Sequence, residues 1–225
     1  MPEPVVTKKP RLLMADDHSI MLAGLQKLVE SMCEVVGTVQ DGRALVEAAE
    51  RLRPDLILLD ISMPLLNGVD AARQIKKSVP DAKLLFLTMH ASPVFATEAL
   101  QAGGSGYLLK QSAASELPQA IESVLAGKTY LTPSIIKPVL SSIAQQDSVG
   151  LRTSVMGLTP RQREVLQLIA EGRCAKDIAV LLNISVKTVE FHKTRVMEQL
   201  NLHSALELAR FAIAEGLVSA DTGRS

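Results

Sequence analysis

The chain has 225 residues, of which 47% are hydrophobic, and its formal net charge at pH 7 is zero. This length is enough for two modest domains, each with a core of its own. No apolar run approaches the roughly 20 residues of a membrane-spanning helix, and the N-terminal residues lack the apolar centre of a signal peptide. These features predict neither a membrane span nor a signal peptide, so we expect a cytoplasmic protein.

The charges are unevenly distributed along the chain. Residues 11–126 contain 10 basic and 14 acidic residues, whereas residues 161–195 contain seven basic and four acidic residues. An acidic front half and a locally basic back segment indicate two domains with different tasks. The two cysteines, Cys33 and Cys174, are far apart and fit no metal-ligand spacing, which predicts two buried free thiols.

The first half of the chain alternates between short apolar runs and amphipathic stretches. The apolar runs predict five strands, at residues 12–15, 35–39, 56–59, 84–87 and 106–109. Apolar residues spaced three and four apart predict a helix after each strand, and Ser92-Pro93 marks the start of one of them. Strands that are apolar on both faces and alternate with helices predict a doubly wound (βα)₅ α/β fold with a parallel sheet.

Residues 127–157 differ in composition from the segments on either side. They are mostly small and polar, which predicts a linker. One short helix is expected near residues 134–143, broken or kinked by Pro138.

From Leu158 onward the sequence has a helical pattern throughout. "TPRQ" at 159–162 predicts a capping box that opens a helix to about Ala170. Short and longer helices at 176–182 and 186–200 follow, separated by a tight turn, and "SALE" at 204–207 opens a last helix. The pattern predicts an all-α domain of four helices, and its two middle helices have the lengths of a helix-turn-helix.

Polar residues stand where the predicted strands of the first half end. Asp16 and Asp17 follow the first strand, Asp60 follows the third, Thr88 ends the fourth and Lys110 follows the fifth. Ligands of such sheets bind beyond the carboxyl ends of the strands. Crowded carboxylates favour a cation, and all-oxygen ligands suit Mg²⁺. Asp60 could then attack a phosphoryl group, with Lys110 and Thr88 stabilising its oxygens, to give an aspartyl phosphate.

Residues 11–126 resemble the receiver domain of a two-component response regulator. The resemblance rests on "MADDH", "LLDISMPLLNG", "LFLTMH" and "GYLLK", which occur in this order. It implies that Asp60 accepts a phosphoryl group from a sensor histidine kinase. It also implies that Asp16, Asp17 and the backbone carbonyl of Ser62 bind the metal, and that Tyr107 is a switch residue.

The sequence departs from many receivers at one position. Where they have a proline in a cis peptide after the lysine, this chain has Gln111, so we expect no cis bond there. His18 and His90 border the predicted pocket. His90, two residues after Thr88, could influence hydrolysis of the phosphate or could be an ordinary loop residue.

The sequence from 158 to 216 resembles the LuxR-type helix-turn-helix of the NarL/FixJ class. Helix 186–200 would bury Val189, Val196 and Leu200 and present its opposite face to the major groove. Phe191 on that face could touch a thymine methyl group or a neighbouring helix, and His192 lies nearer the inner side. The candidate DNA-contacting residues are Lys176, Lys187, Glu190, Phe191, Lys193, Thr194 and Arg195.

The predicted organisation has five segments. They are an N-terminal tail (1–10), a receiver domain (11–126), a linker (127–157), a LuxR-type DNA-binding domain (158–217) and a C-terminal tail (218–225). We interpret the protein as a transcription factor, not an enzyme, in which Mg²⁺-dependent phosphorylation of Asp60 favours a homodimer that binds promoter DNA. RNA polymerase is a further candidate partner.

Three other functions agree less well with the sequence. A phosphatase of the haloacid-dehalogenase type needs a second acid two residues after the nucleophile, where this chain has Ser62. A regulator that senses a small molecule would need a cavity in the first half, but the chain has no Trp and only 3% aromatic residues. A regulator that works without phosphorylation would not need the complete set of acids, Thr88 and Lys110.

Overall fold

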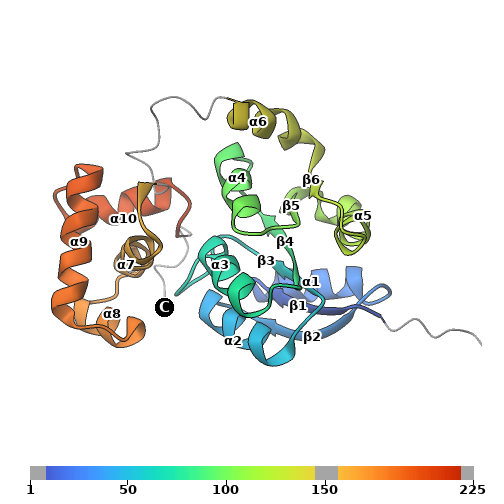
Figure 1. The fold of residues 1–225 in the computed structure, drawn as a ribbon, viewed down its shortest axis with the longest axis horizontal. Helices are drawn as coiled ribbons and strands as arrows, with labels where there is room; N and C mark the ends of the chain where they lie inside the picture. Colours follow the sequence, from blue (N-terminus) through green and yellow to red (C-terminus); the bar gives the residue numbers. More distant parts are fainter. Residues whose placement is uncertain (1–8, 145–156, 219–225) are drawn as a thin grey trace, which may run out of the picture.

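The structure is a computed structural model that describes residues 9–144 and 157–218. These residues form a sheet covered by helices, followed by a separate group of four helices (Figure 1). The predicted tails and linker fall partly on residues 1–8, 145–156 and 219–225, which lie outside the described residues. No described helix is long and apolar enough to cross a membrane.

A six-stranded parallel sheet forms the centre of the first unit, with the strand order β2-β1-β3-β4-β5-β6. The strands are β1 (Arg11–Ala15), β2 (Glu34–Val39), β3 (Leu56–Leu59), β4 (Lys83–Thr88), β5 (Gly106–Leu109) and β6 (Tyr130–Leu131). The first five agree with the predicted strands. The strand order reverses between β1 and β3, where an open α/β sheet has its ligand-binding crevice.

Helices cover both faces of this sheet, as predicted. They are α1 (Ser19–Val29), α2 (Gly42–Leu52), α3 (Gly68–Ser78), α4 (Pro93–Gln101) and α5 (Ala113–Leu125). Alternate strand residues point to opposite faces. Leu13, Ile57 and Phe86 therefore lie in one core with α2, α3 and α4, whereas Leu12 and Leu85 lie in the other with α1 and α5.

The chain after α5 differs from the predicted linker. Tyr130–Leu131 extends the sheet by pairing with β5, and α6 (Pro133–Ala144) runs through Pro138 without a break and packs beside α4. Ile135 and Val139, four residues apart, are buried in the core on the α2–α4 side. This burial holds the helix together although Pro138 cannot donate a backbone hydrogen bond. The five segment boundaries remain a prediction.

The second unit contains the four predicted helices. They are α7 (Pro160–Ala170), α8 (Ala175–Leu182), α9 (Val186–Leu200) and α10 (Ala205–Ala214). Thr159 and Gln162 form the predicted capping box of α7, and the Ser185 side chain caps α9. Of the two free cysteines, Cys33 is buried but Cys174 is exposed, so the prediction of two buried thiols is wrong for Cys174. Cys174 stands at the solvent-facing N-cap of α8.

Candidate functional site

The polar residues that follow the strands meet at the carboxyl edge of the sheet. Asp16 follows β1 and Asp60 follows β3, and the parallel register of these strands sets the two carboxylates side by side. Thr88 ends β4, which pairs in register with β5 just before Lys110. All four side chains are buried. The structure thus brings together residues that lie up to 94 positions apart in the sequence, Asp16 and Lys110 being the outermost.

The Lys110 ammonium bridges two of the carboxylates. Its Nζ atom lies 2.7 Å from Asp16 Oδ2 and 2.7 Å from Asp60 Oδ2. Burial alone would lower the pKa of Lys110, but the charges and hydrogen bonds of Asp60 and Asp16 outweigh it and raise the pKa above its usual range. Lys110 therefore stays charged and neutralises part of the acidic cluster.

Neighbouring groups fix both the side chain and the backbone of Asp60. The Oδ1 atom of Asp60 accepts a hydrogen bond of 2.6 Å from the backbone N–H of Ile61, which leaves Oδ2 on the side of Lys110. Gly68, the first residue of α3, packs directly against the backbone carbonyl of Asp60, and a Cβ atom there would collide with that oxygen. The N-cap residue Asn67 fixes the start of α3 by accepting a hydrogen bond from Asp70 N.

A group of candidate metal ligands, two carboxylates and an imidazole, lies beside this bridge. One ligand atom from each of Asp16, Asp17 and His18 lies within 4.8 Å of the others. Asp17 Oδ1 is buried and accepts no hydrogen bond from the described residues, although it forms an ion-pair contact of 2.7 Å with His18 Nδ1. Burial raises the pKa of Asp17, opposed by the charge of His18 and increased by those of Asp16 and Asp60. An unsatisfied buried carboxylate oxygen beside a second carboxylate fits Mg²⁺.

Thr88, His90 and Tyr107 form the neighbouring wall. The backbone N–H of His90 donates to Thr88 Oγ1 over 3.3 Å, and the Tyr107 hydroxyl donates to the His90 carbonyl over 2.7 Å. The Tyr107 ring is fully buried, and burial together with the charge of Asp60 raises its pKa. Burial lowers the pKa of His90, and its ring shares a 2.8 Å hydrogen bond with Ser62 Oγ.

A pocket of about 240 Å³ opens onto Asp60, and part of its lining comes from the helical unit. Ile213, Gly216 and Val218 line it together with Asp60, Ser62, Thr88 and both predicted border residues, His18 and His90. Sequence reasoning missed the three residues from the helical unit. In the sequence, Gly216 follows a helical stretch, and a glycine at this place is typical of a helix end. Its φ of +66° in the structure agrees with that role. Neither feature indicates that Gly216 lines a pocket.

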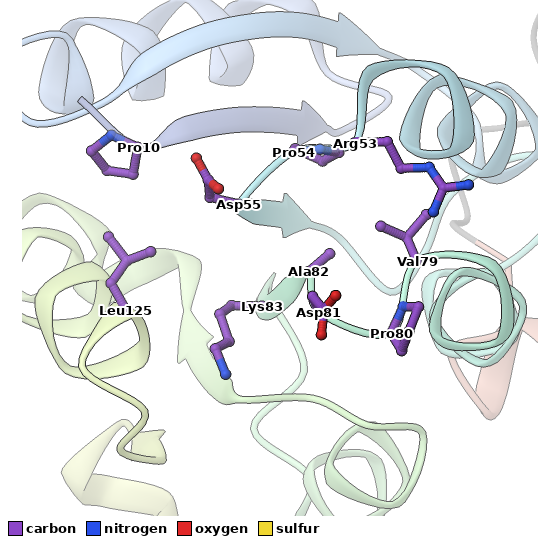
Figure 2. Close-up of a pocket in the computed structure, with 10 residues that line it drawn as sticks. All are labelled: Pro10, Arg53, Pro54, Asp55, Val79, Pro80, Asp81, Ala82, Lys83 and Leu125. Carbon is purple, nitrogen blue, oxygen red and sulfur yellow. The ribbon is translucent and has the colours of Figure 1, made fainter. Parts of the chain in front are cut away.

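A larger hollow of about 560 Å³ lies at the opposite, amino edge of the strands (Figure 2). Two of its charged residues already have partners: Asp55 Oδ2 accepts a hydrogen bond from Arg11 N, and Arg53 Nη1 donates to the Ser78 carbonyl. Asp81, on the same rim, is exposed. We therefore assign no chemistry to this hollow.

The predicted DNA-reading helix has the two faces that the sequence indicates. Val189, Val196 and Leu200 are buried, whereas Phe191 is 55% exposed and lies 5.5 Å beneath the Arg195 guanidinium. Lys187, Glu190, Thr194 and Arg195 are exposed, Lys193 and His192 are half-buried, and Lys176 stands exposed on α8. An exposure this large excludes close packing of Phe191 on a neighbouring helix.

Two family models account for most of the chain. Residues 12–122 match the response regulator receiver domain, and residues 156–212 match the bacterial regulatory proteins of the luxR family. A parallel doubly wound sheet with an acidic pocket at its carboxyl edge, followed by a helix-turn-helix unit, defines the class of two-component response regulators.

The whole-chain relatives are regulators of the same layout. The transcriptional regulatory protein MctR of Rhizobium johnstonii is 32% identical over 95% of this chain and 99% of its own. The response regulator UvrY of Escherichia coli is 32% identical (94% and 97% covered), and the oxygen regulatory protein NreC of Staphylococcus epidermidis is 38% identical (92% and 99% covered).

Solved structures extend the comparison to three dimensions. The RcsB response regulator of Salmonella typhimurium has a TM-score of 0.66 and 29% identity, with 92% of this chain and 98% of that chain covered. An RcsB–DNA complex has a TM-score of 0.57 and 28% identity, with 92% and 99% covered. The chain belongs to the NarL/FixJ family of response regulators, which join a receiver domain to a LuxR-type helix-turn-helix domain.

Proposed function

We propose that Asp60 accepts a phosphoryl group from a sensor histidine kinase in a Mg²⁺-dependent reaction, and that phosphorylation favours a homodimer that binds promoter DNA. The observation that carries this proposal is the buried Asp16–Lys110–Asp60 bridge beside the unsatisfied oxygen of Asp17. Metal-dependent labelling of Asp60 by a small phosphodonor tests it. The protein is then a regulator rather than an enzyme, and RNA polymerase is a further candidate partner on DNA.

The chemistry at Asp60 is a phosphoryl transfer between two side chains. The ionised Asp60 Oδ2 attacks the phosphorus of a phosphohistidine, a P–O bond forms as the P–N bond breaks, and the leaving imidazole nitrogen takes a proton from water. Lys110, now 2.7 Å from Oδ2, is close enough to donate to an oxygen of the transferred group. The Thr88 hydroxyl lies on the same edge and can donate to another.

The metal would be held by Asp16, Asp17, Asp60 and the backbone carbonyl of Ser62. When bound, Mg²⁺ supplies positive charge that offsets the repulsion between the carboxylates and the incoming phosphoryl oxygens. Asp17 supports this role because its buried Oδ1 atom accepts no hydrogen bond from the described residues and has only the ion-pair contact with His18 Nδ1.

Thr88 and Tyr107 are the candidates for transmitting the effect of phosphorylation from the pocket to α4. A Thr88 hydroxyl that turns to the phosphoryl group releases the hydrogen bond that it accepts from His90 N. The Tyr107 ring is already buried, with its hydroxyl on the His90 carbonyl, so the inward position of this ring does not require phosphate. The segment around His90 thus connects both residues to α4. A movement of Thr88 would shift an existing equilibrium between the inactive and active conformations of the receiver.

We expect phosphorylation to change the oligomeric state. A beryllofluoride adduct of the parent should sediment as a dimer at protein concentrations where the unmodified protein sediments mainly as a monomer, since the adduct stabilises the active conformation. The Asp60→Asn protein, treated identically, is the control. An identical mass distribution with and without beryllofluoride would rule out control by dimerisation.

We expect α9 to read base edges in the major groove. Lys187→Ala and Phe191→Ala should each cost on the order of 1–3 kcal/mol of binding free energy and relax the preference at particular base pairs. Lys193→Ala should weaken binding to all sequences about equally, because a phosphate contact carries no sequence information.

Binding-site selection followed by titration of the selected DNA checks this expectation. Lys128→Ala, which removes an exposed lysine between α5 and β6, is the control for the loss of one positive charge. If Lys187→Ala and Phe191→Ala keep the parent's sequence preference and affinity, α9 is not the reading helix.

A further inference from the structure

Side chains of the helical unit make hydrogen bonds to the loop that follows Asp60, residues 61–67. The Gln167 side chain, which is fully buried on α7, donates from Nε2 to the Met63 carbonyl and accepts from Asn67 N, both over 2.8 Å. Glu171 Oε1 accepts from Leu65 N over 3.0 Å. Backbone groups on both sides of Leu65 are therefore satisfied by the other domain, which fixes the loop and the domain together.

Leu65 adds an apolar anchor to these hydrogen bonds. Its side chain packs against the cluster of Val165, Leu168 and Ile178 in the helical unit. Its φ is +65°, in a region that residues other than glycine rarely adopt. The contact with the helical unit adds to hydrogen bonds within the receiver, such as that from Leu66 N to the Pro64 carbonyl, in holding this conformation.

A buried ion pair lies beside the loop. Arg163 on α7 donates from Nε and Nη2 to the two oxygens of Asp70 on α3, over 3.0 and 2.8 Å. Burial alone would raise the pKa of Asp70, but the hydrogen bonds and charge of Arg163, with a hydrogen bond from Asn67, lower it. A two-point guanidinium–carboxylate contact fixes orientation as well as distance, so it sets how α7 lies on α3.

The turn after α10, residues 216–218, covers part of the pocket at Asp60. The Gly216 carbonyl accepts a 3.0 Å hydrogen bond from Ser62 Oγ. A second hydrogen bond, of 2.8 Å, joins Ser62 Oγ to His90 Nε2. Gly216, Leu217 and Val218 are all buried. Gly216 and Val218 line the 240 Å³ pocket on Asp60, with Ile213 beside them.

The DNA-reading face remains open in this arrangement. Helix α9 lies on the side of the helical unit that faces away from the receiver (Figure 1). Phe191 is 55% exposed, and Lys187 and Arg195 are exposed as well. What the docked form covers is the acceptor pocket rather than the DNA-reading helix.

We propose that the turn Gly216–Val218 is a lid on Asp60, locked by Gln167 and the Arg163–Asp70 pair, so that phosphoryl donors reach Asp60 only when the domains separate. This inference rests on the proposed role of Asp60. Because lid and phosphoryl group compete for one pocket, each weakens the other to the same degree. Domain docking then controls the rate of phosphorylation, while the DNA-reading face of α9 stays exposed.

Gly216→Ala tests the lid. An added Cβ would lie 2.5 Å from His90 Cε1, so it should push the turn off the pocket. The matched control is Gly172→Ala, which places alanine at a similar positive φ (+81°) after α7 with no atom within 4 Å. Labelling by phosphoramidate in Mg²⁺ should be at least about threefold faster in Gly216→Ala, since the apparent rate follows the open fraction. Gly172→Ala should label at the parent's rate.

Arg163→Gln tests the lock independently. Its control, Arg210→Gln, changes an exposed arginine of α10 in the same helical unit. Arg163→Gln should label faster than the parent and Arg210→Gln should not. Small-angle X-ray scattering should show a larger radius of gyration for Arg163→Gln and Gly216→Ala only.

The outcomes separate the lid from the function on which it rests. If the parent takes no label at Asp60, the proposed function fails and the lid fails with it. If the parent is labelled but Gly216→Ala and Arg163→Gln match its rate, the lid alone is refuted. Equal acceleration in Gly172→Ala, or acceleration without expansion in scattering, would also refute it, because the effect would then arise within one domain.

Discussion

Asp60→Asn should reduce labelling by acetyl phosphate to background. The amide of asparagine is not a nucleophile, whereas the carboxylate is. Asparagine can still accept the 2.6 Å hydrogen bond from Ile61 N, so the loop should keep its shape and the thermal unfolding curve should remain cooperative. Intact-protein mass spectrometry after exposure to acetyl phosphate and Mg²⁺ measures the effect, and chelation of the metal should abolish labelling of the parent.

Asp55→Asn is the matched control. Asp55 is an exposed carboxylate at the other end of β3, where it accepts a hydrogen bond from Arg11 N. Its variant should label like the parent. Persistent labelling of the Asp60→Asn protein would mean that another group accepts the phosphoryl.

Gly68→Ala should damage stability and labelling together. Alanine at this position would drive its Cβ into the backbone carbonyl of Asp60, which is buried and cannot move far. We expect a loss of about 3 kcal/mol or more in the free energy of unfolding, in the range of severe core strain. Because the displaced atoms belong to Asp60 itself, labelling should fall at least about tenfold, equivalent to roughly 1.4 kcal/mol in the barrier.

The control for this substitution is Gly24→Ala in α1. A Cβ atom on Gly24 would meet nothing within 4 Å, and alanine is favoured over glycine in a helix interior by roughly 0.5–1 kcal/mol. Urea denaturation should therefore show Gly24→Ala at or above the parent's stability. A Gly68→Ala protein as stable and as readily labelled as the parent would show that the loop tolerates a shift of its backbone.

Local chemical patterns explain why much of this fold follows from the sequence. The apolar runs of β1 and β3 to β5 are bounded sharply by polar residues, and parallel strands carry those residues to one edge of the sheet. The positions of Asp16, Asp60, Thr88 and Lys110 follow from that rule. Thr159 and Ser185 mark helix starts because each can cap a free backbone N–H.

Other features depend on contacts that no local pattern encodes. The two residues of β6 are too few for an alternating pattern, and α6 exists through the burial of Ile135 and Val139 despite Pro138. The Gly216 turn carries the mark of a helix end, and only the docking of the domains places it beside Ser62. Arg163 and Asp70 lie 93 residues apart, each on its own helix, without a motif to join them.

The bridge formed by Lys110 gives the acidic pocket an internal counter-ion. Three crowded carboxylates without compensation would repel one another strongly enough to oppose folding. With the ammonium 2.7 Å from both Asp16 and Asp60, the pocket can assemble before any divalent ion arrives. Zinc fingers are the opposite case, since their ligands have no partner until the metal binds and the metal supplies the folding energy. Under the proposed function, a divalent ion can therefore bind and leave the pocket while the fold persists.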